Sequence, residues 1–213
     1  MTRGFSSRRS GITATFDKAE VAVLRGLLGE LLELLRGDEQ KPSPPSEPTE
    51  PTAGSPAPRD SEEAQDFADD PFAAIVRHLG GTDDDKPEPP SDEVLKRLLP
   101  NAYVDDEDAA AEFRRFTEQG LRDGKVTNAE TVLGSLGEPN RKGEVTVTLD
   151  RGEAEAWLRT LTDLRLAIGT RLGVDQDDDV RWAMLDDDSY AKQVYGVYLW
   201  LGYVQESLVH ALF

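Results

Sequence analysis

Aspartates are the residues of this 213-residue chain whose spacing most resembles a reactive or metal-binding site. Asp175, Asp177 and Asp179 have the spacing of the first three calcium ligands of an EF-hand loop, which needs oxygen ligands at alternate positions around a glycine turn. The remaining positions do not fit, because the sixth is Val180 and the twelfth is Asp186. We therefore expect a solvated acidic loop between two helices rather than a calcium site.

A second acidic run directly precedes Ser189 and the last helical pattern of the chain. Carboxylates in the first turn of a helix are favoured by the helix dipole, so Asp186, Asp187 and Asp188 are expected to supply charge there. Paired carboxylates can also perform acid and base chemistry, but a contiguous run cannot stand on two sides of a substrate. An enzyme that uses carboxylate chemistry is therefore kept only as an alternative class.

Histidine and cysteine, which carry out much of protein catalysis and metal binding, are almost absent. The chain has no cysteine and two histidines, His78 and His210. Structural disulfides, thiolate zinc sites and thiol nucleophiles are excluded, and no histidine pair has metal-ligand spacing. No Gly-rich phosphate loop or nucleophile elbow occurs. We predict a protein that is not an enzyme and that has no cofactor or metal.

The formal charge of −18 at pH 7 points to protein partners. A chain this acidic is repelled by nucleic acids and by anionic lipid at long range. The most apolar run, Val194 to Val204, is much shorter than the roughly 20 residues that span a bilayer. Met1 to Ser10 lacks the apolar centre of a signal peptide. We expect a cytoplasmic protein that binds another protein and no membrane; a homo-oligomer stays open.

The middle of the chain has the spacing of a helix-turn-helix unit. A helix is expected from about Asp105 through Leu121, followed by a turn at Asp123 and Gly124 and a second helix over 128–136. That second helix contains Glu130 and no Lys or Arg. A recognition helix must present cations or amides to base edges, so we do not expect direct nucleic-acid binding.

The domain organisation follows from composition. Most of the 13 prolines lie between positions 42 and 90, in a stretch of Ser, Glu, Thr and Ala with little apolar content. Such a segment buries too little area to offset chain entropy, so residues 37–70 are predicted to be a disordered acidic linker. Residues 71–80 are predicted to form a short helix within the insert. Residues 11–36 and 91–213 are predicted to form one helical domain.

Two segments repeat the same strand, cap and helix pattern. Residues 12–20 (ITATFDKAE) align without gaps with residues 145–153 (VTVTLDRGE). Each has a period-two strand pattern, then an Asp followed three residues later by a Glu, which is the spacing of a capping box. Helices should follow each cap. Because a lone strand leaves its backbone unpaired, the two strands should pair as a small two-stranded β ribbon in an otherwise mainly α fold.

The last predicted helix, Ser189 to Phe213, has apolar residues at spacings of three and four and many aromatic side chains. Helical position favours the core for Trp157 and Trp200, whereas Trp182, between two acidic runs, is the better surface candidate. An exposed apolar patch rimmed by aspartates would bind a partner with a basic rim. The candidate partner-binding residues are Trp182, Tyr190, Tyr198, Asp186, Asp187 and Asp188.

Three segments resemble an actinobacterial domain-of-unknown-function family whose genes are often found beside that of the ClpS protease adaptor. They are residues 102–125 (AYVDDEDAAAEFRRFTEQGLRDGK), 163–174 (DLRLAIGTRLGV) and 194–212 (VYGVYLWLGYVQESLVHAL). A mycobacterial member is described as an oxidative-stress-responsive transcriptional regulator that works with a sigma factor. The resemblance implies regulation through contacts with a sigma factor or other transcription machinery. Its gene neighbourhood suggests an adaptor in ClpS-dependent proteolysis as the alternative.

The chain differs from that mycobacterial member in its cysteine content. The response of the mycobacterial protein is attributed to cysteines, and this chain has none. Redox sensing by a thiol of this chain is therefore impossible.

Overall fold

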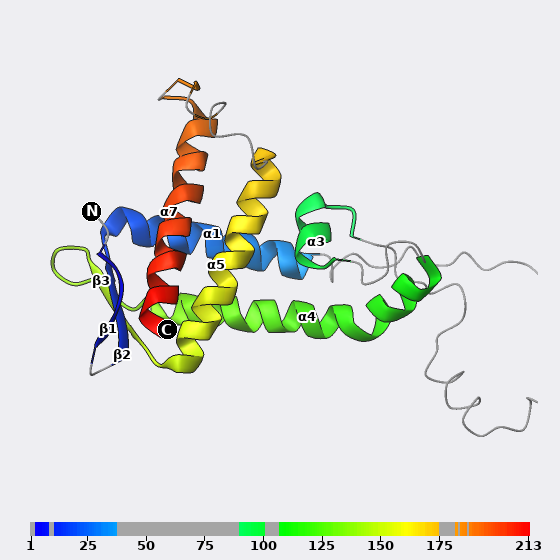
Figure 1. Cartoon of the computed structure of the whole chain (residues 1–213), viewed down its shortest axis with the longest axis horizontal. Coiled ribbons are helices and arrows are strands. Elements are labelled where there is room, and N and C mark those ends of the chain that lie inside the picture. Colours follow the sequence, from blue (N-terminus) through cyan, green and yellow to red (C-terminus); the bar gives the residue numbers. More distant parts are fainter. Residues whose placement is uncertain are drawn as a thin grey trace, which may run out of the picture.

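The computed structural model describes residues 3–8, 11–37, 90–100, 107–174, 182, 184–186 and 188–213. The predicted short helix 71–80 and residues 38–70 of the predicted linker lie outside these residues. Gly37, the first residue of the predicted linker, is instead the last residue of a helix. Within them the chain forms five helices and a small antiparallel sheet (Figure 1). The elements are β1 (Arg3–Arg8), β2 (Gly11–Phe16), α1 (Lys18–Gly37), α3 (Glu93–Leu98), α4 (Glu107–Ser135), β3 (Val145–Leu149), α5 (Arg151–Leu172) and α7 (Tyr190–Leu212).

The predicted pairing of the two alternating segments is confirmed. Strands β2 and β3 are antiparallel neighbours, with Ala14 opposite Val147 and Ile12 opposite Leu149. The sheet has a third strand, β1, which pairs with β2 to give the order β1-β2-β3. The two-stranded ribbon of the sequence prediction is thus extended to three strands. The sequence of β1, RGFSSR, shows no apolar alternation, because Phe5 is its single hydrophobic residue.

The register of β2 and β3 also supports the repeated unit. In the sequence alignment Ala14 is equivalent to Val147, and these two residues face each other across the sheet. The flanking equivalents are exchanged across the pair, which is the arrangement that a local two-fold axis produces. The helices that follow place their equivalent residues in one core: Leu24, Leu28, Leu31, Leu35, Trp157, Leu161, Leu164 and Ile168 are all buried.

Both predicted capping boxes are present. The backbone N–H of Glu20 donates to Asp17 Oδ1 at 3.0 Å, and the backbone N–H of Asp17 donates to Glu20 Oε2 at 2.8 Å. Asp150 and Glu153 repeat this exchange at 2.8 and 2.9 Å before α5. Reciprocal hydrogen bonds of this kind satisfy the free N–H groups at a helix start.

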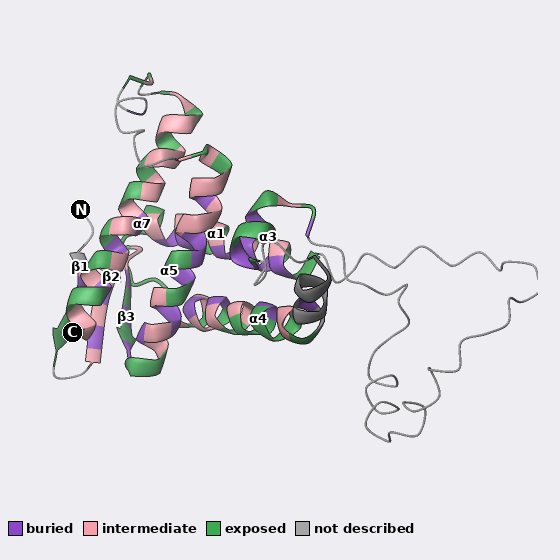
Figure 2. Cartoon of the chain, turned by 45° about the vertical axis from the view of Figure 1, so that its right-hand side comes forward, coloured by how far each residue is buried: buried purple, intermediate pink, exposed green. Residues whose placement is uncertain are grey.

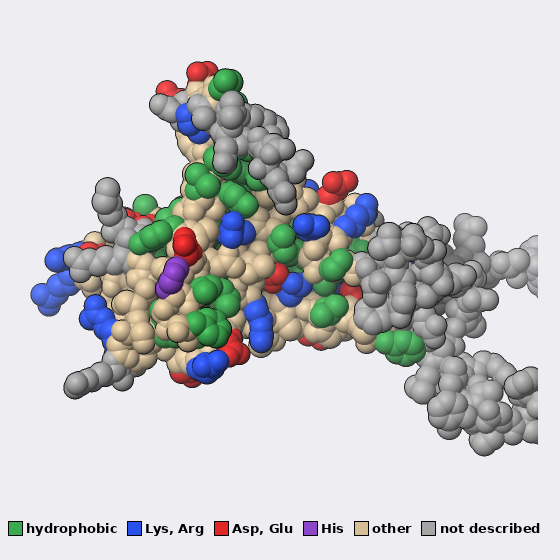
Figure 3. All heavy atoms as spheres, viewed as in Figure 1, with side chains coloured by type: hydrophobic (Ala, Val, Ile, Leu, Met, Phe, Trp, Pro, Cys, Tyr) green, Lys and Arg blue, Asp and Glu red, His purple; other side chains and the backbone are tan. Residues whose placement is uncertain are grey.

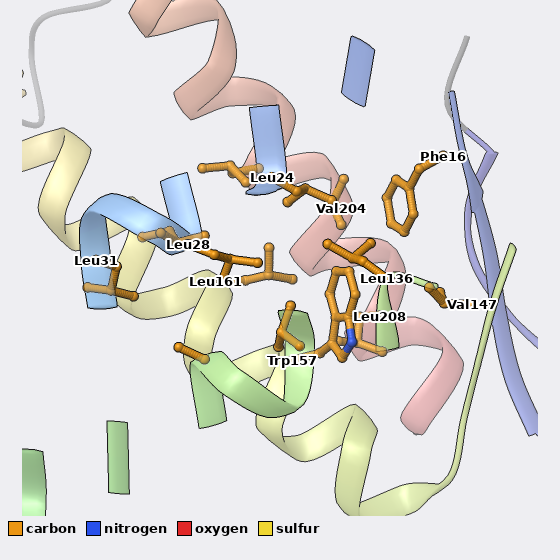
Figure 4. Close-up of a cluster of buried hydrophobic side chains, with 14 of the residues drawn as sticks. Phe16, Leu24, Leu28, Leu31, Leu136, Val147, Trp157, Leu161, Val204 and Leu208 are labelled. Carbon is orange, nitrogen blue, oxygen red and sulfur yellow. The ribbon is translucent and has the colours of Figure 1, made fainter. Parts of the chain in front are cut away.

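The core lies where the sheet, α1, α4, α5 and α7 meet (Figure 4). Trp157 is fully buried and stacks on Phe16, with ring centroids 5.6 Å apart. Its indole N–H donates to Ser135 Oγ at 2.8 Å, so the polar atom of this large side chain is satisfied inside the protein. Phe5 of β1 contacts both rings edge-on. The prediction that Trp157 belongs to the core is confirmed.

The turn predicted at Asp123 and Gly124 is wrong, because α4 runs without a break from Glu107 to Ser135. A glycine inside a helix costs about 1 kcal/mol relative to alanine. Contacts on both sides of it favour the helix: the buried Arg122 guanidinium donates to the carbonyl of Leu35 at 2.7 Å, and Lys125 pairs with Asp163 at 2.6 Å. Without the turn, the helix-turn-helix interpretation fails.

Helices α5 and α7 lie side by side and antiparallel, and α1 crosses them (Figures 1 and 2). The C-terminal half of α7 lies next to the sheet, where the backbone N–H of Phe5 donates to Ser207 Oγ at 2.9 Å. The N-terminal half of α7 and the C-terminal half of α5 project beyond the sheet. This projection sets the geometry of the candidate site.

Candidate protein-binding groove

The apolar face of α7 is covered along only part of its length. Tyr190, Leu201 and Leu208 share one face of the helix, since they are separated by 11 and 7 residues, or about three and two helical turns. Leu201 and Leu208 are fully buried, whereas Tyr190 is 82% exposed. Figure 2 shows the same change along the α5–α7 pair, from purple near the sheet to pink and green in the projecting part. The core-facing side of α7 is therefore open at its N-terminal end.

This open end forms one wall of a groove of about 660 Å³. The α1, α5 and α7 helices supply aliphatic side chains, and α3 contributes Val94 at one end. Most of these side chains are half-buried, so the groove continues the hydrophobic core outward. The lining residues are Ala22, Val23, Gly26, Leu27, Glu30, Leu31, Glu33, Leu34, Val94, Leu164, Ala167, Ile168, Arg171, Tyr190, Val194 and Val197.

The charged residues of the groove differ in whether their charge is neutralised. Arg171 donates to Asp92 Oδ2 at 2.5 Å, so its positive charge is paired. Glu30 and Glu33 on α1 have no ion-pair partner in the part of the chain that the structure describes. The rim is therefore acidic beside an apolar floor.

Asp92 joins the start of α3 to the end of α5. Its Oδ1 accepts hydrogen bonds from the N–H groups of Val94 and Leu95, and its Oδ2 accepts from Arg171. Partial desolvation favours the protonated acid, but the Arg171 hydrogen bond and the two amides outweigh it and hold the pKa of Asp92 below its ordinary value. This ionised carboxylate fixes one end of the groove.

The sequence-based candidates do not form one cluster. Tyr190 lines the groove, and its aromatic side chain is exposed. The prediction that Trp182 lies on the surface is wrong, because its side chain is 3% exposed and its ring stacks on Tyr195 at 4.7 Å. The local sequence around Trp182 is acidic, but tertiary stacking against α7 decides its burial.

Tyr198 lies on a different side of α7 from Tyr190. It stacks on Tyr195 at 5.9 Å and lies under the Arg165 guanidinium, whose carbon is 5.0 Å from the ring centroid. Arg165 also donates to Gln205 at 2.7 Å. Tyr198 thus takes part in packing between α5 and α7, and the structure does not bring it to the groove.

The acidic residues before α7 are placed only in part. Asp186 and Asp188 are exposed, and Asp187 lies outside the described residues, as do Asp175, Asp177 and Asp179. The cap of α7 is Ser189, whose Oγ accepts from the backbone N–H of Lys192 at 3.3 Å. Within the described part of the chain, no three Asp, Glu or His side chains are grouped to hold a metal ion.

A buried ion pair joins α4 to α5 on another side of the molecule. Lys125 Nζ lies 2.6 Å from Asp163 Oδ1, and both side chains are largely buried. Burial raises the pKa of Asp163, although the Lys125 hydrogen bond and charge act in the opposite direction. The pair lines a hollow of about 330 Å³, and among the described residues that line it Asp163 is the single acid. A single carboxylate paired with a lysine is what an ion pair that stabilises the packing of two helices requires.

Apolar side chains are also exposed on the outer side of α7, at Leu199, Tyr203 and Val209. On the face shown in Figure 3, hydrophobic side chains stand among basic side chains, acidic side chains and a histidine. Here the apolar surface is divided by charges, in contrast to the continuous aliphatic floor of the groove.

Sequence reasoning missed the contribution of α1 to the site. Leu27 and Leu34 line the groove beside Glu30 and Glu33. The sequence did contain an indication of this contribution, because α1 has more leucines than one buried face needs. Leu27 and Leu34 lie beside the buried leucines at positions 24, 28, 31 and 35. A wide apolar face on a helix indicates a second contact.

Comparison with known proteins identifies the family. The model of a family described as "Domain of unknown function (DUF2017)" matches residues 2–212, so the chain belongs to this family. The resemblance seen in the sequence is thereby confirmed. No solved structure matches the chain. None of the helices in the described residues has the length and apolar content needed to cross a bilayer.

Curated relatives come from mycobacteria. The chain is 29% identical over 206 residues to the "Putative oxidative stress regulator AosR" of Mycobacterium leprae, which covers 91% of this chain and 78% of that protein. It is 31% identical over 136 residues to the "Oxidative stress regulator AosR" of Mycobacterium bovis and of Mycobacterium tuberculosis H37Rv. Those two alignments cover 58% of this chain and 59% of each relative.

Proposed function

We propose that this protein is a non-enzymatic, cytoplasmic regulator in the oxidative-stress response, and that it acts by binding another protein through the α1–α5–α7 groove. The names of its mycobacterial relatives support the stress role. The observation that carries the binding role is the exposure of Tyr190 on the face of α7 that is otherwise buried. Open apolar surface bordered by polar residues is typical of protein interaction sites.

The partner in this proposal is a sigma factor or another component of the transcription machinery. The support is the family resemblance together with the charge of −18, which disfavours direct contact with DNA. A regulator that DNA repels can still change transcription by binding a protein that contacts DNA.

A non-enzymatic role is supported by the state of the perturbed carboxylates. Among the described residues, Asp92 and Asp163 are the two acids with a shifted pKa, and each is held by a cation. Asp92 bonds to Arg171 and Asp163 to Lys125. Groups engaged in ion pairs between helices are poorly placed to exchange protons with a substrate.

Affinity purification of the tagged full chain from its host, with and without oxidant, tests the proposal. We expect a sigma factor or polymerase component to copurify with the wild type and to be lost with Tyr190→Ala. The control Leu199→Ala, on the outer side of α7, should retain it. Recovery of ClpS in place of a transcription protein would contradict the proposal and favour the adaptor alternative. Because the chain has no cysteine, an effect of oxidant cannot arise at a thiol of this chain.

A further inference from the structure

We propose that the groove binds an amphipathic helix of the partner, with large apolar side chains on one face and Lys or Arg beside them. This inference rests on the proposed function, since it names the chemistry of the segment that the groove receives. The groove dimensions, its charge and its opening each support it.

The dimensions match a helix. Along α1 the groove extends from Ala22 to Leu34, which corresponds to about 18 Å at 1.5 Å per residue. Along α7 it extends from Tyr190 to Val197, or about 10 Å. Apolar anchors at positions i, i+3 or i+4, and i+7 of a helix span about 10 Å. One amphipathic helix can therefore place its anchors between these two walls.

The charge of the rim selects a cationic segment. Glu30 and Glu33 stand one turn apart on α1, beside Leu31 and Leu34, and neither is paired within the described residues. Arg171, the single cation among the described lining residues, is neutralised by Asp92. A bound Lys or Arg would pair with either glutamate, and the overall charge of −18 would increase the association rate at low salt.

The same charges argue against a second copy of this chain. An isologous dimer through the groove would place the glutamates of one copy near those of the other. Each copy also carries a charge of −18. Juxtaposed like charges oppose association, so a cationic partner is the better match. A small apolar ligand fits less well, because the groove is open enough to leave Tyr190 82% exposed.

A synthetic helical peptide of about 16 residues, with leucines on one face and lysines elsewhere, is the probe. Two peptides serve as controls: one with the same composition but with leucines on all faces, and one with glutamates in place of lysines. Fluorescence anisotropy with the full chain should give at least about tenfold tighter binding of the first peptide than of either control, a difference of about 1.4 kcal/mol.

Variants of the chain locate the binding. Val194→Asp in the groove should weaken peptide binding by at least about tenfold, whereas Leu199→Asp on the outer side should change it by less than about twofold. The double variant Glu30→Gln with Glu33→Gln should clearly reduce the loss of affinity between about 50 and about 300 mM NaCl, because these two charges lie closest to the bound peptide. The matched double variant Glu138→Gln with Glu206→Gln should retain it.

The outcomes separate this inference from the proposed function. Groove-dependent copurification of a partner, combined with equal binding of the lysine and glutamate peptides, would overturn the inference and leave the proposed function standing. Loss of groove dependence in the copurification would overturn the proposed function itself. If the lysine peptide binds only after deletion of residues 71–80, the chain's own segment is the occupant and the inference is wrong. Self-association that Val194→Asp abolishes would likewise assign the groove to a second copy.

Discussion

The two halves of α7 carry the same apolar spacing but meet different surroundings. In the C-terminal half, Val204 and Leu208 pack with Trp157 and the sheet (Figure 4). In the N-terminal half, Tyr190 and Val194 line an open groove. Helical periodicity determines which face of α7 is apolar. The position of the sheet, which lies next to the C-terminal half alone, determines how much of that face is covered. The uncovered remainder is where we place binding.

Truncation of a side chain in the covered half should have the largest effect on stability. Leu208→Ala should lower the free energy of unfolding by about 3 kcal/mol, since it leaves a cavity in a fully buried position. Val194→Ala in the open half should cost less than about 1 kcal/mol, because its side chain is only partly buried. Chemical denaturation monitored by circular dichroism measures both. Similar losses would show that the two halves are equally covered.

The ion pair between α4 and α5 is expected to contribute next. Lys125→Met should cost roughly 2–3 kcal/mol near pH 7, because it leaves the Asp163 carboxylate largely buried without a counter-charge. The exposed pair of Arg151 and Glu155 provides the control, and Arg151→Met should cost less than about 0.5 kcal/mol.

The pH dependence of this variant has a definite sign. The folded pKa of Asp163 is raised, so its contribution to stability is present below its unfolded pKa of about 3.9 and is lost as the pH rises through the folded value. The variant lacks both the hydrogen bond and the charge of Lys125, which oppose the increase in the pKa of Asp163. The penalty of Lys125→Met should therefore be larger near pH 7 than near pH 4. A penalty independent of pH would refute this account of the pair.

The variant Asp92→Ala, at one end of the groove, should lower the stability of the protein modestly. We expect a loss of about 1 kcal/mol near pH 7, because the variant removes a helix cap together with the partner of Arg171. The folded pKa of Asp92 is lowered, so its contribution is present above the unfolded pKa of about 3.9 and is lost as the pH falls through the folded value.

The variant Asp92→Asn separates the two roles of this residue, because asparagine caps helices about as well as aspartate. It should retain most of the stability but release the charge of Arg171 into the groove. Peptide binding should then become weaker. Unchanged binding of the lysine peptide would mean that the charge of Arg171 does not reach the bound segment.

The smallest effect on stability is expected for Tyr190→Ala. The free energy of unfolding should change by less than about 0.5 kcal/mol, because the side chain is exposed, while partner capture is lost. Trp182→Ala is the contrasting variant and should destabilise the protein, since it removes a buried ring stacked on Tyr195. Unfolding of the Tyr190→Ala variant would place that side chain in the core.

Local signals predicted most of the fold. The alternation of Ile12, Ala14 and Phe16, the two Asp and Glu caps, and the spacing of leucines in α1 are properties of short segments, and the structure retains them. Strand β1 and the unbroken α4 depend on distant residues. Phe5 is placed by contacts with α7, and Arg122 holds α4 helical through the carbonyl of Leu35. A short sequence window contains neither partner.

The groove was predictable only in part for the same reason. The cluster of aromatic residues indicated a contact region, and Tyr190 lines the groove. Burial of Trp182 depends on its stacking with Tyr195, and the acidity of the rim depends on α1 lying next to α7. Glu30 and Glu33 have an ordinary surface sequence context. Their contribution to an acidic rim depends on the pairing of Arg171 with Asp92, which the structure shows.

The most direct test of the open groove uses thiol reactivity, because the chain has no cysteine of its own. Three full-length variants, Tyr190→Cys, Leu199→Cys and Leu208→Cys, each introduce one thiol, and the rate of reaction with a neutral thiol reagent is measured with and without the lysine peptide. In the free protein we predict that Tyr190→Cys reacts at about the rate of Leu199→Cys and at least about 100 times faster than Leu208→Cys. The peptide should then protect Tyr190→Cys and leave Leu199→Cys unchanged. Reaction of Tyr190→Cys as slow as that of Leu208→Cys in the free protein would show that the groove is covered, and would contradict the account.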